Sequence, residues 1–140
     1  MQITQEIIGA WHQHVFGDWI KEIEVEWETV EEGLITATLE NKEKYCSHLK
    51  QGKDRMYGQV IMALTDTMSF MVLYTTPIKP LGTLTQHSSF IGAAKGPFFK
   101  IECRVKKLGK RISHVETTWH DSEDTLVFHC VSSFTMMEEK

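Results

Sequence analysis

Residues 57–74, YGQVIMALTDTMSFMVLY, form a long and nearly uninterrupted apolar stretch that decides the fold. After Gly58 the stretch contains no glycine or proline, and it is rich in Met, Leu and Ala, which are good helix formers. It therefore predicts a buried helix of about 16 residues. A helix that is apolar nearly all round must be covered by other elements on most of its sides. One carboxylate, Asp66, interrupts the pattern.

Strand-like alternation of apolar and polar residues flanks this stretch on both sides. Before it, residues 23–29 and 34–40 predict a hairpin that turns at residues 31–33. After it, the alternation continues through four more segments, which predict strands over residues 83–91, 98–107, 111–120 and 125–135. Near the N-terminus, residues 3–16 carry apolar side chains at helical spacing and predict a short amphipathic helix.

This order of elements predicts an α+β fold, with a long central helix wrapped by a six-stranded antiparallel sheet and a short N-terminal helix. We expect one domain, residues 1–140, because 140 residues suit a single core. One sheet covers only one side of the central helix. A second copy of the chain would cover more, so we expect a homo-oligomer, either a dimer or a dimer of dimers that is a homotetramer.

Composition excludes several classes of protein. A net charge of −4 argues against nucleic acid as a partner. No apolar run approaches the roughly 20 residues that span a bilayer, and the N-terminus does not resemble a signal peptide. Three widely spaced cysteines form no disulfide framework and are expected in the core, which favours a cytoplasmic location. The seven histidines show no metal-ligand spacing, so we expect no metal.

Two residues of the central helix suggest chemistry. Asp66 lies within an apolar run, where a carboxylate can serve as a general base or a nucleophile. Alternatively, Asp66 belongs to a polar stripe in which Thr65 and Ser69 face solvent. Gly58 begins the helix, where unpaired N–H groups and the helix dipole favour an oxyanion. Alternatively, Gly58 only lets the chain turn into the helix.

A basic cluster occupies one predicted hairpin of this otherwise acidic chain. The cluster attracts phosphate groups, unless it is simply a solvated hairpin tip. Its members are Arg104, Lys106, Lys107, Lys110 and Arg111.

Three segments together resemble the hotdog-fold acyl-CoA thioesterases, in particular the phenylacetic-acid-degradation (PaaI-like) group. They are YGQVIMALTD at residues 57–66, GTLTQHSSFIGAA at residues 82–94 and RVKKLGKRISHVE at residues 104–116. The resemblance covers about residues 20–136. It implies a hotdog fold that hydrolyses acyl-CoA to free acid and CoA, with CoA as part of the substrate and no other cofactor.

The resemblance also implies roles for individual residues. Asp66 corresponds to the base or nucleophile, and the helix start at Gly58 to the oxyanion site. Thr83 matches a Ser or Thr that holds the attacking water. Ser69, one turn after Asp66, is an alternative partner for the carboxylate. In such dimers the helix start of one subunit faces the carboxylate of the other.

Other matched positions are expected to contact substrate. Gln59 stands where the family has its second glycine, and its amide is placed to donate to the thioester oxygen. Tyr57 stands where the family has histidine, and either Gln51 or Lys50 matches a polar residue in the preceding loop. Tyr57 and Gln51 are expected at the CoA site, together with the basic residues Lys106, Lys107, Lys110 and Arg111.

Three alternatives to a thioesterase stay open. The changes at Tyr57 and Gln59 favour a hotdog protein that binds acyl-CoA or a lipid without turnover. A hotdog hydratase needs a His paired with an acid, and residues 57–74 contain no His. A lipid carrier of another α+β fold is the last. The side chains of Met62, Met68, Phe70 and Met71 line either an acyl pocket or the core.

Overall fold

The computed structural model describes residues 3–47 and 54–137, and its elements follow the predicted order. The two α-helices are α1 (Gln5–His14) and α2 (Gly58–Tyr74). The six strands are β1 (Val25–Glu31), β2 (Leu34–Glu40), β3 (Pro80–Phe90), β4 (Phe98–Lys107), β5 (Ile112–Asp121) and β6 (Leu126–Met136). Short 3₁₀ turns at Ile20–Glu22 and Glu43–Tyr45 were not predicted.

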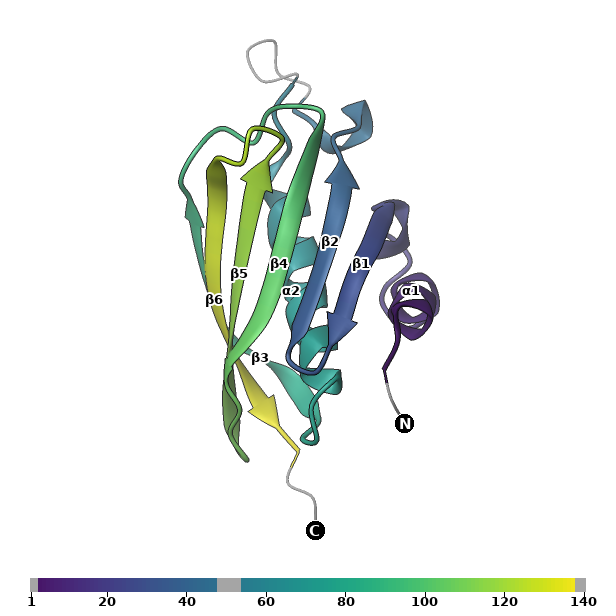
Figure 1. Ribbon diagram of the computed structural model, residues 1–140, viewed down its shortest axis with the longest axis vertical. Helices are drawn as coiled ribbons and strands as arrows, with labels where there is room; N and C mark the ends of the chain where they lie inside the picture. The colour runs from purple at the N-terminus through teal and green to yellow at the C-terminus, as the bar shows by residue number, and fades with distance from the viewer. Residues whose placement is uncertain (1–2, 48–53, 138–140) are drawn as a thin grey trace.

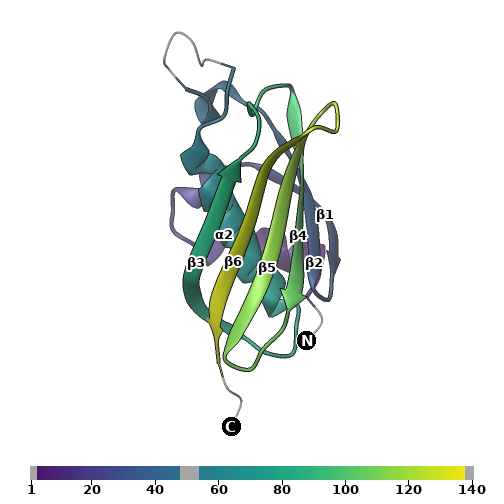
Figure 2. The same cartoon turned by 90° about the vertical axis from the view of Figure 1, so that its left-hand side faces the viewer.

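The strands form one antiparallel sheet in the order β1-β2-β4-β5-β6-β3. The sheet curves around α2, which runs along its concave face, and α1 lies beyond the β1 edge (Figures 1 and 2). β1 and β3 are the two edge strands. The predicted α+β fold is therefore confirmed.

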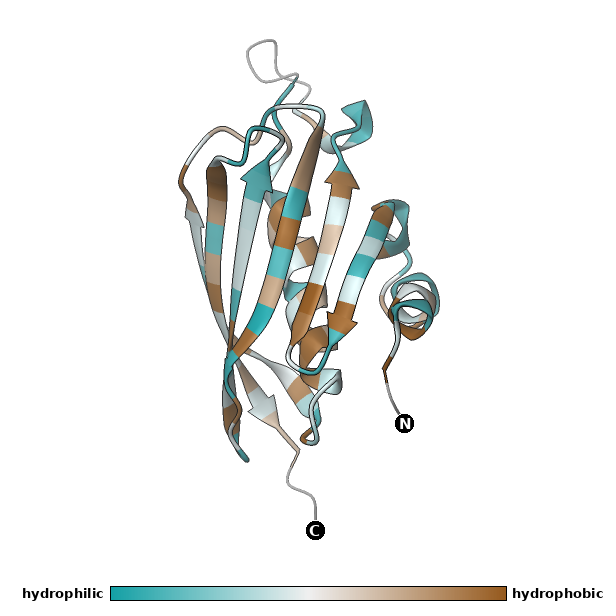
Figure 3. Cartoon of the chain, viewed as in Figure 1, coloured by the Kyte–Doolittle hydropathy of each residue, from teal (hydrophilic) through white to brown (hydrophobic). Residues whose placement is uncertain are grey.

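The core lies between the sheet and α2. Along β4, buried Phe99, Ile101 and Cys103 alternate with exposed Lys100 and Glu102, as the banded strand in Figure 3 shows. Nine of the 17 residues of α2 are buried. The predicted alternation thus directs one side of each central strand toward α2.

Turn chemistry fixes the ends of these elements. Gly33, between β1 and β2, has a φ of 77°, a left-handed conformation that favours glycine. Its N–H donates to Thr75 Oγ1 at 2.8 Å, which ties the first hairpin to the end of α2. β3 begins at Pro80 rather than at residue 83, since proline is tolerated at the first position of an edge strand.

α1 packs against β1 through His12 and Trp27. The His12 side chain is buried, and its ring lies 5.6 Å from the Trp27 ring at an interplanar angle of 84°. Its Nε2 lies 2.9 Å from the Ile20 carbonyl oxygen, so this nitrogen carries the proton and donates. His12 therefore joins α1 to the 3₁₀ turn that follows it. Neither described helix is both long and apolar enough to cross a membrane.

Candidate active site

The side of α2 that faces away from the sheet carries the candidate site. Gln59 and Met62 are exposed, and Asp66 and Phe70 are half-buried, so these four side chains mark one stripe along the helix. Their spacing of three or four residues places them on neighbouring turns. The carboxylate of Asp66 consequently lies at the boundary between the apolar core and solvent, where water can reach it.

Asp66 has a specific partner on the edge strand β3. The Thr83 hydroxyl donates a hydrogen bond to Asp66 Oδ1 at 2.7 Å. A second contact, from Gln86 Nε2 to the Met62 carbonyl at 3.1 Å, holds the same strand against the same helix. The structure therefore brings together Asp66 and Thr83, two predicted site residues that are distant in sequence.

A β-bulge explains how Thr83 reaches the helix. Thr83 lies opposite Phe134 and Thr85 opposite Ser133, so Leu84 is the extra residue. Phe134 is fully buried toward α2, and Thr83 shares its side of the sheet. The hydroxyls of Thr85 and Ser133 form their own pair beyond the bulge.

The role proposed for Ser69 is wrong in this structure. Ser69 is fully buried, and its hydroxyl donates to the Thr65 carbonyl at 2.7 Å instead of reaching Asp66. Thr65 is buried as well, and its hydroxyl accepts a hydrogen bond from Trp119 Nε1 at 3.0 Å. Thr65 and Ser69 therefore face the sheet, and the solvent-facing polar stripe that they would form with Asp66 is also wrong.

The start of α2 leaves backbone donors unpaired. Tyr57 is the N-cap residue and makes no side-chain cap, and Val60 and Ile61 donate back to the Tyr57 carbonyl. Within the described parts of the chain, no acceptor lies on the N–H groups of Gly58 and Gln59. This is the arrangement that an oxyanion needs.

Phe90 adds a feature at this helix start that the sequence did not indicate. A Cβ built on Gly58 would lie 3.1 Å from Phe90 Cζ, at the limit of close contact. Phe90 is the last residue of β3 and is half exposed, stacked beside Phe128 with ring centroids 4.9 Å apart. The missing side chain at Gly58 thus makes room for this ring.

Three further residues, Tyr57, Gln59 and Gln51, were predicted to contact substrate near the helix start. Gln59 is exposed on the first turn of α2, and Tyr57 is partly exposed. The Tyr57 N–H donates to the Tyr45 carbonyl at 2.8 Å. Gln51 lies outside the described residues.

The basic hairpin between β4 and β5 lies near the end of α2, away from Gly58 (Figure 1). The side chains of Lys106, Lys107, Lys110 and Arg111 are all exposed there. Lys106 Nζ lies 3.9 Å from Glu116 Oε1, a weak surface pair. A Cβ at Gly109 would clash with the Ile112 carbonyl oxygen, so the tight turn that gathers these residues requires glycine.

The residues that were predicted to line either an acyl pocket or the core lie partly in the core and partly beside a cavity. Met68 and Met71 are fully buried core residues, and Met62 is partly exposed. Phe70 lines a cavity of about 250 Å³ between α1 and α2, together with Trp11, Val15, Phe16 and Tyr74. The sequence placed the apolar residues of α1 at helical spacing but gave no sign that they border this cavity.

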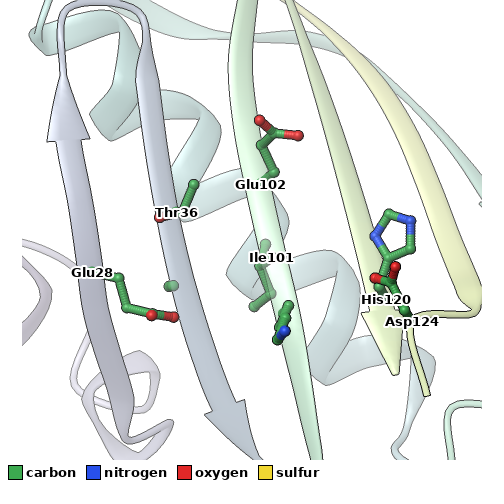
Figure 4. A pocket seen from close by; sticks show the side chains of 8 residues that line it. Glu28, Thr36, Ile101, Glu102, His120 and Asp124 are labelled. Atoms are coloured by element: carbon green, nitrogen blue, oxygen red, sulfur yellow. The ribbon is translucent and has the colours of Figure 1, made fainter. Parts of the chain in front are cut away.

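Another hollow, of about 410 Å³, lies on the outer face of the sheet (Figure 4). It is lined by Glu28, Thr36, Ala37, Lys100, Ile101, Glu102, His120 and Asp124. These residues come from β1, β2, β4, β5 and the following turn, on the far side of the sheet from Asp66. None of the predicted site residues lines it.

The cysteines are core residues, as expected. Cys46, Cys103 and Cys130 are free and buried. Burial raises the pKa of Cys103 to about 12, so its sulfur stays a thiol at neutral pH and is a poor nucleophile. No cluster of metal-binding side chains occurs within residues 3–47 and 54–137.

Solved structures with the same fold include thioesterases and a protein with acetyl-CoA bound. The protein smu.793 of Streptococcus mutans, solved with acetyl-CoA bound, is 18% identical with a TM-score of 0.74, over 84% of this chain and 91% of that chain. A thioesterase of Haemophilus influenzae is 13% identical with a TM-score of 0.82, over 99% and 93%. Zebra fish thioesterase superfamily member 2 is 15% identical with a TM-score of 0.80, over 94% of each chain.

No protein-family model matches the chain, and no curated protein matches it in sequence. The likeness therefore defines the fold alone: the chain has the hotdog fold that its sequence motifs predicted.

Proposed function

We propose that the protein is an acyl-CoA thioesterase in which Asp66 activates the attack on the thioester. The observation that supports this most directly is the hydrogen bond from Thr83 to Asp66, on the open side of an otherwise apolar helix. A carboxylate at the edge of a core is unfavourable unless it is bonded, and its retention there is typical of a functional group. Two proteins of the same fold, one with acetyl-CoA bound and the other a thioesterase, support the same chemistry.

The reaction needs a base or nucleophile and an oxyanion site. In one route Asp66 takes a proton from water, and the hydroxide attacks the carbonyl carbon; CoA leaves as the thiolate and takes that proton. In the other, an Asp66 oxygen attacks the carbonyl and expels CoA, and water hydrolyses the anhydride. In both, Thr83 fixes the carboxylate, and the N–H groups of Gly58 and Gln59 stabilise the oxyanion.

We propose that each site is shared between two chains. Asp66 is eight residues beyond Gly58, or about 12 Å along the helix axis, which is too far for both to act on one carbonyl group. A partner helix running in the opposite direction brings a second Gly58 to Asp66. The free backbone edge of β3 forms a surface suited to such a partner, together with the exposed side chains of Leu81, Leu84 and Phe90 and of Ile91, which follows the strand.

The basic hairpin is the proposed site for the CoA phosphates. Lys107 and Lys110 are exposed cations at the tip, and Lys106 and Arg111 flank them. The end of α2 lies near this hairpin and is eight residues from Asp66, about 12 Å along the axis. The extended pantetheine arm of CoA fits that separation. The free, buried cysteines are consistent with a reducing compartment, and we infer a cytoplasmic location.

The second candidate function is acyl-CoA binding without turnover. The position of Phe90 favours it, because this ring contacts the helix start where a thioester carbonyl would approach Gly58. The substitution of Gln59 for a glycine adds bulk at the same place.

The rate of acyl-CoA hydrolysis by the wild type separates these two functions, and the variant Asp66→Asn tests the role of the carboxylate. It keeps the volume of the side chain and an oxygen acceptor for Thr83, but removes the base or nucleophile. We expect kcat on the best acyl-CoA to fall at least about 100-fold with little change in KM. Glu102→Gln, which changes an exposed carboxylate on the outer sheet face, serves as the control and should keep wild-type kcat. An Asp66→Asn enzyme with wild-type kcat would show that Asp66 is neither base nor nucleophile, and a wild-type protein that binds acyl-CoA without hydrolysing it would leave binding as the function.

A further inference from the structure

Gln86, on the edge strand β3, makes a hydrogen bond to α2 that the proposed function does not use. Its Nε2 donates to the Met62 carbonyl oxygen at 3.1 Å, which is a normal length for this kind of bond. The side chain is half-buried. Since β6 is the only neighbour of β3 in the sheet, contacts with α2 decide how closely the free edge of β3 follows the helix.

The carbonyl that accepts this bond belongs to the turn of α2 that carries Asp66. In an α-helix the N–H of each residue donates to the carbonyl four residues earlier, so the Met62 carbonyl also accepts from the Asp66 N–H. A carbonyl oxygen has two lone pairs and can accept both donors. Gln86 therefore attaches β3 to the backbone of α2 at the group that also bonds the Asp66 backbone.

Thr83 attaches the same strand to the same turn through side chains. Its hydroxyl donates to Asp66 Oδ1 at 2.7 Å. A bond of this kind weakens steeply when its distance or angle changes. A small shift of β3 away from α2 would therefore release the carboxylate, and the Gln86 bond opposes that shift.

The bulge at Leu84 allows both side chains to face α2. Thr83 lies opposite Phe134 and Gln86 opposite Ser132, and both of these β6 residues are buried. In a regular strand two residues that are three apart point to opposite faces of the sheet. The extra residue in the bulge shifts this alternation by one, so both side chains point to the helix.

We propose that Gln86 is a positioning residue for the thioesterase reaction: it holds β3 against residues 62–66 and thereby keeps Thr83 bonded to the Asp66 carboxylate; the proposal rests on the acyl-CoA thioesterase function. In this role Gln86 touches neither the substrate nor the reacting atoms. It acts on the rate because a misplaced catalytic group is much less reactive, even when the displacement is about 1 Å.

The first experiment removes the donor while keeping the length of the side chain. In Gln86→Met we expect kcat on the best acyl-CoA to fall about fivefold and KM to change less than about twofold, because orientation of the carboxylate matters in the transition state. Gln86→Glu has the same shape but an acceptor in place of the donor, and should lose at least as much. Gln13→Met, the same substitution at an exposed position of α1, is the matched control and should keep both constants.

The second experiment combines Gln86→Met with Thr83→Val. If Gln86 acts through Thr83, kcat of the double variant should equal that of Thr83→Val within about twofold, because the bond that Gln86 supports is already absent. Two independent contributions would instead multiply their losses. Unchanged kcat in Gln86→Met, or multiplied losses in the double variant, would overturn the proposal while leaving the thioesterase function intact.

Urea unfolding tests the same coupling without hydrolysis. The double variant should lose less free energy of unfolding than the sum of the two single losses, since residues that share one contact are not additive. Losses that add would overturn the proposal whether or not the wild type hydrolyses acyl-CoA. Smaller combined losses in a wild type that hydrolyses no acyl-CoA would refute the proposed function and still support the positioning of Thr83 by Gln86.

Discussion

Thr83 and Asp66 show how a single hydrogen bond can be tested at the scale of one residue. The bond is 2.7 Å long and reaches a half-buried carboxylate. We predict that Thr83→Val lowers kcat about tenfold because the carboxylate loses its fixed orientation, and that Thr83→Ser restores it. The free energy of unfolding should change by only about 1 kcal/mol. Wild-type kcat in Thr83→Val would show that the hydroxyl does not position Asp66.

A second test concerns Gly58, because glycine at this position can serve either the oxyanion site or the space for the Phe90 ring. We predict that Gly58→Ala lowers both thermal stability and kcat, because the new Cβ crowds Phe90 and the approach to the helix start. Adding Phe90→Leu should recover the melting temperature. If kcat recovers as well, glycine at position 58 is needed only to make room for the Phe90 ring and not to give the thioester access to the backbone N–H groups, which alanine also has.

Whether the role of a residue could be predicted depended on the information in the sequence pattern around it. Asp66 was identifiable because a charge in an apolar run violates the helix pattern. Ser69 was misassigned because helical spacing gives the angle between two residues but not which of them the sheet covers. Phe90 could not be linked to Gly58 from sequence, because their contact depends on where the edge strand ends beside the helix.

At the scale of elements, the β4–β5 hairpin provides a test of CoA binding. We predict that Lys107→Glu together with Lys110→Glu raises KM for acyl-CoA several-fold with little change in kcat, since distant phosphates contribute mainly uniform binding. The effect should shrink at high salt. The double variant Lys21→Glu and Lys100→Glu carries the same charge change elsewhere. If the double variant raised KM equally for pantetheine thioesters, which lack these phosphates, the hairpin would be excluded as the phosphate site.

The buried side chain of His12, which attaches α1, makes the stability of the protein depend on pH. Burial lowers the pKa of His12, although its hydrogen bond to the Ile20 carbonyl acts in the opposite direction. Below about pH 6.5 the unfolded chain therefore takes up a proton more readily than the folded chain. We predict that the free energy of unfolding falls as the pH decreases from 7 to 5, and falls less in His12→Gln. Equal losses in both proteins would show that His12 is not responsible.

Most elements were predictable because their periodicity is strong. Alternation located the strands, and the absence of helix breakers located α2 to within one residue. The 3₁₀ turns were missed because three residues carry no period. The start of β3 was predicted three residues too late because proline is uncommon in strands. Pro80 lies at the first position of the strand, where proline is tolerated.

For the whole molecule, the proposed shared site predicts an obligate oligomer. We expect sedimentation at micromolar concentration to show at least a dimer. Leu84→Lys, which places a charge on the exposed face of the edge strand, should produce a folded monomer with little activity. A wild-type monomer with full activity would contradict the shared site.

The overall architecture followed from the sequence, but the aromatic pocket between α1 and α2 did not. Wrapping a sheet around an apolar helix is the simplest way to bury that helix, and the motif resemblance reached the same fold. The aromatic pocket depends instead on the angle at which α1 meets α2. The contacts that set that angle, such as Trp11 with Tyr74 and Phe16 with Phe70, join residues more than 50 positions apart, and no local pattern encodes them.

The bulge at Leu84 has a consequence for changes in chain length. In a regular strand Thr83 and Thr85 would share one face, but the extra residue lets Thr83 meet Asp66 while Thr85 pairs with Ser133. Deleting Leu84 would remove the bulge and leave Thr83 and Thr85 as consecutive residues opposite Phe134 and Ser133, so each hydroxyl would keep its present face. This strand should therefore tolerate the loss of residue 84, whereas the loss of one residue from the regularly paired stretch 85–90 would turn the side chains beyond it to the opposite face of the sheet.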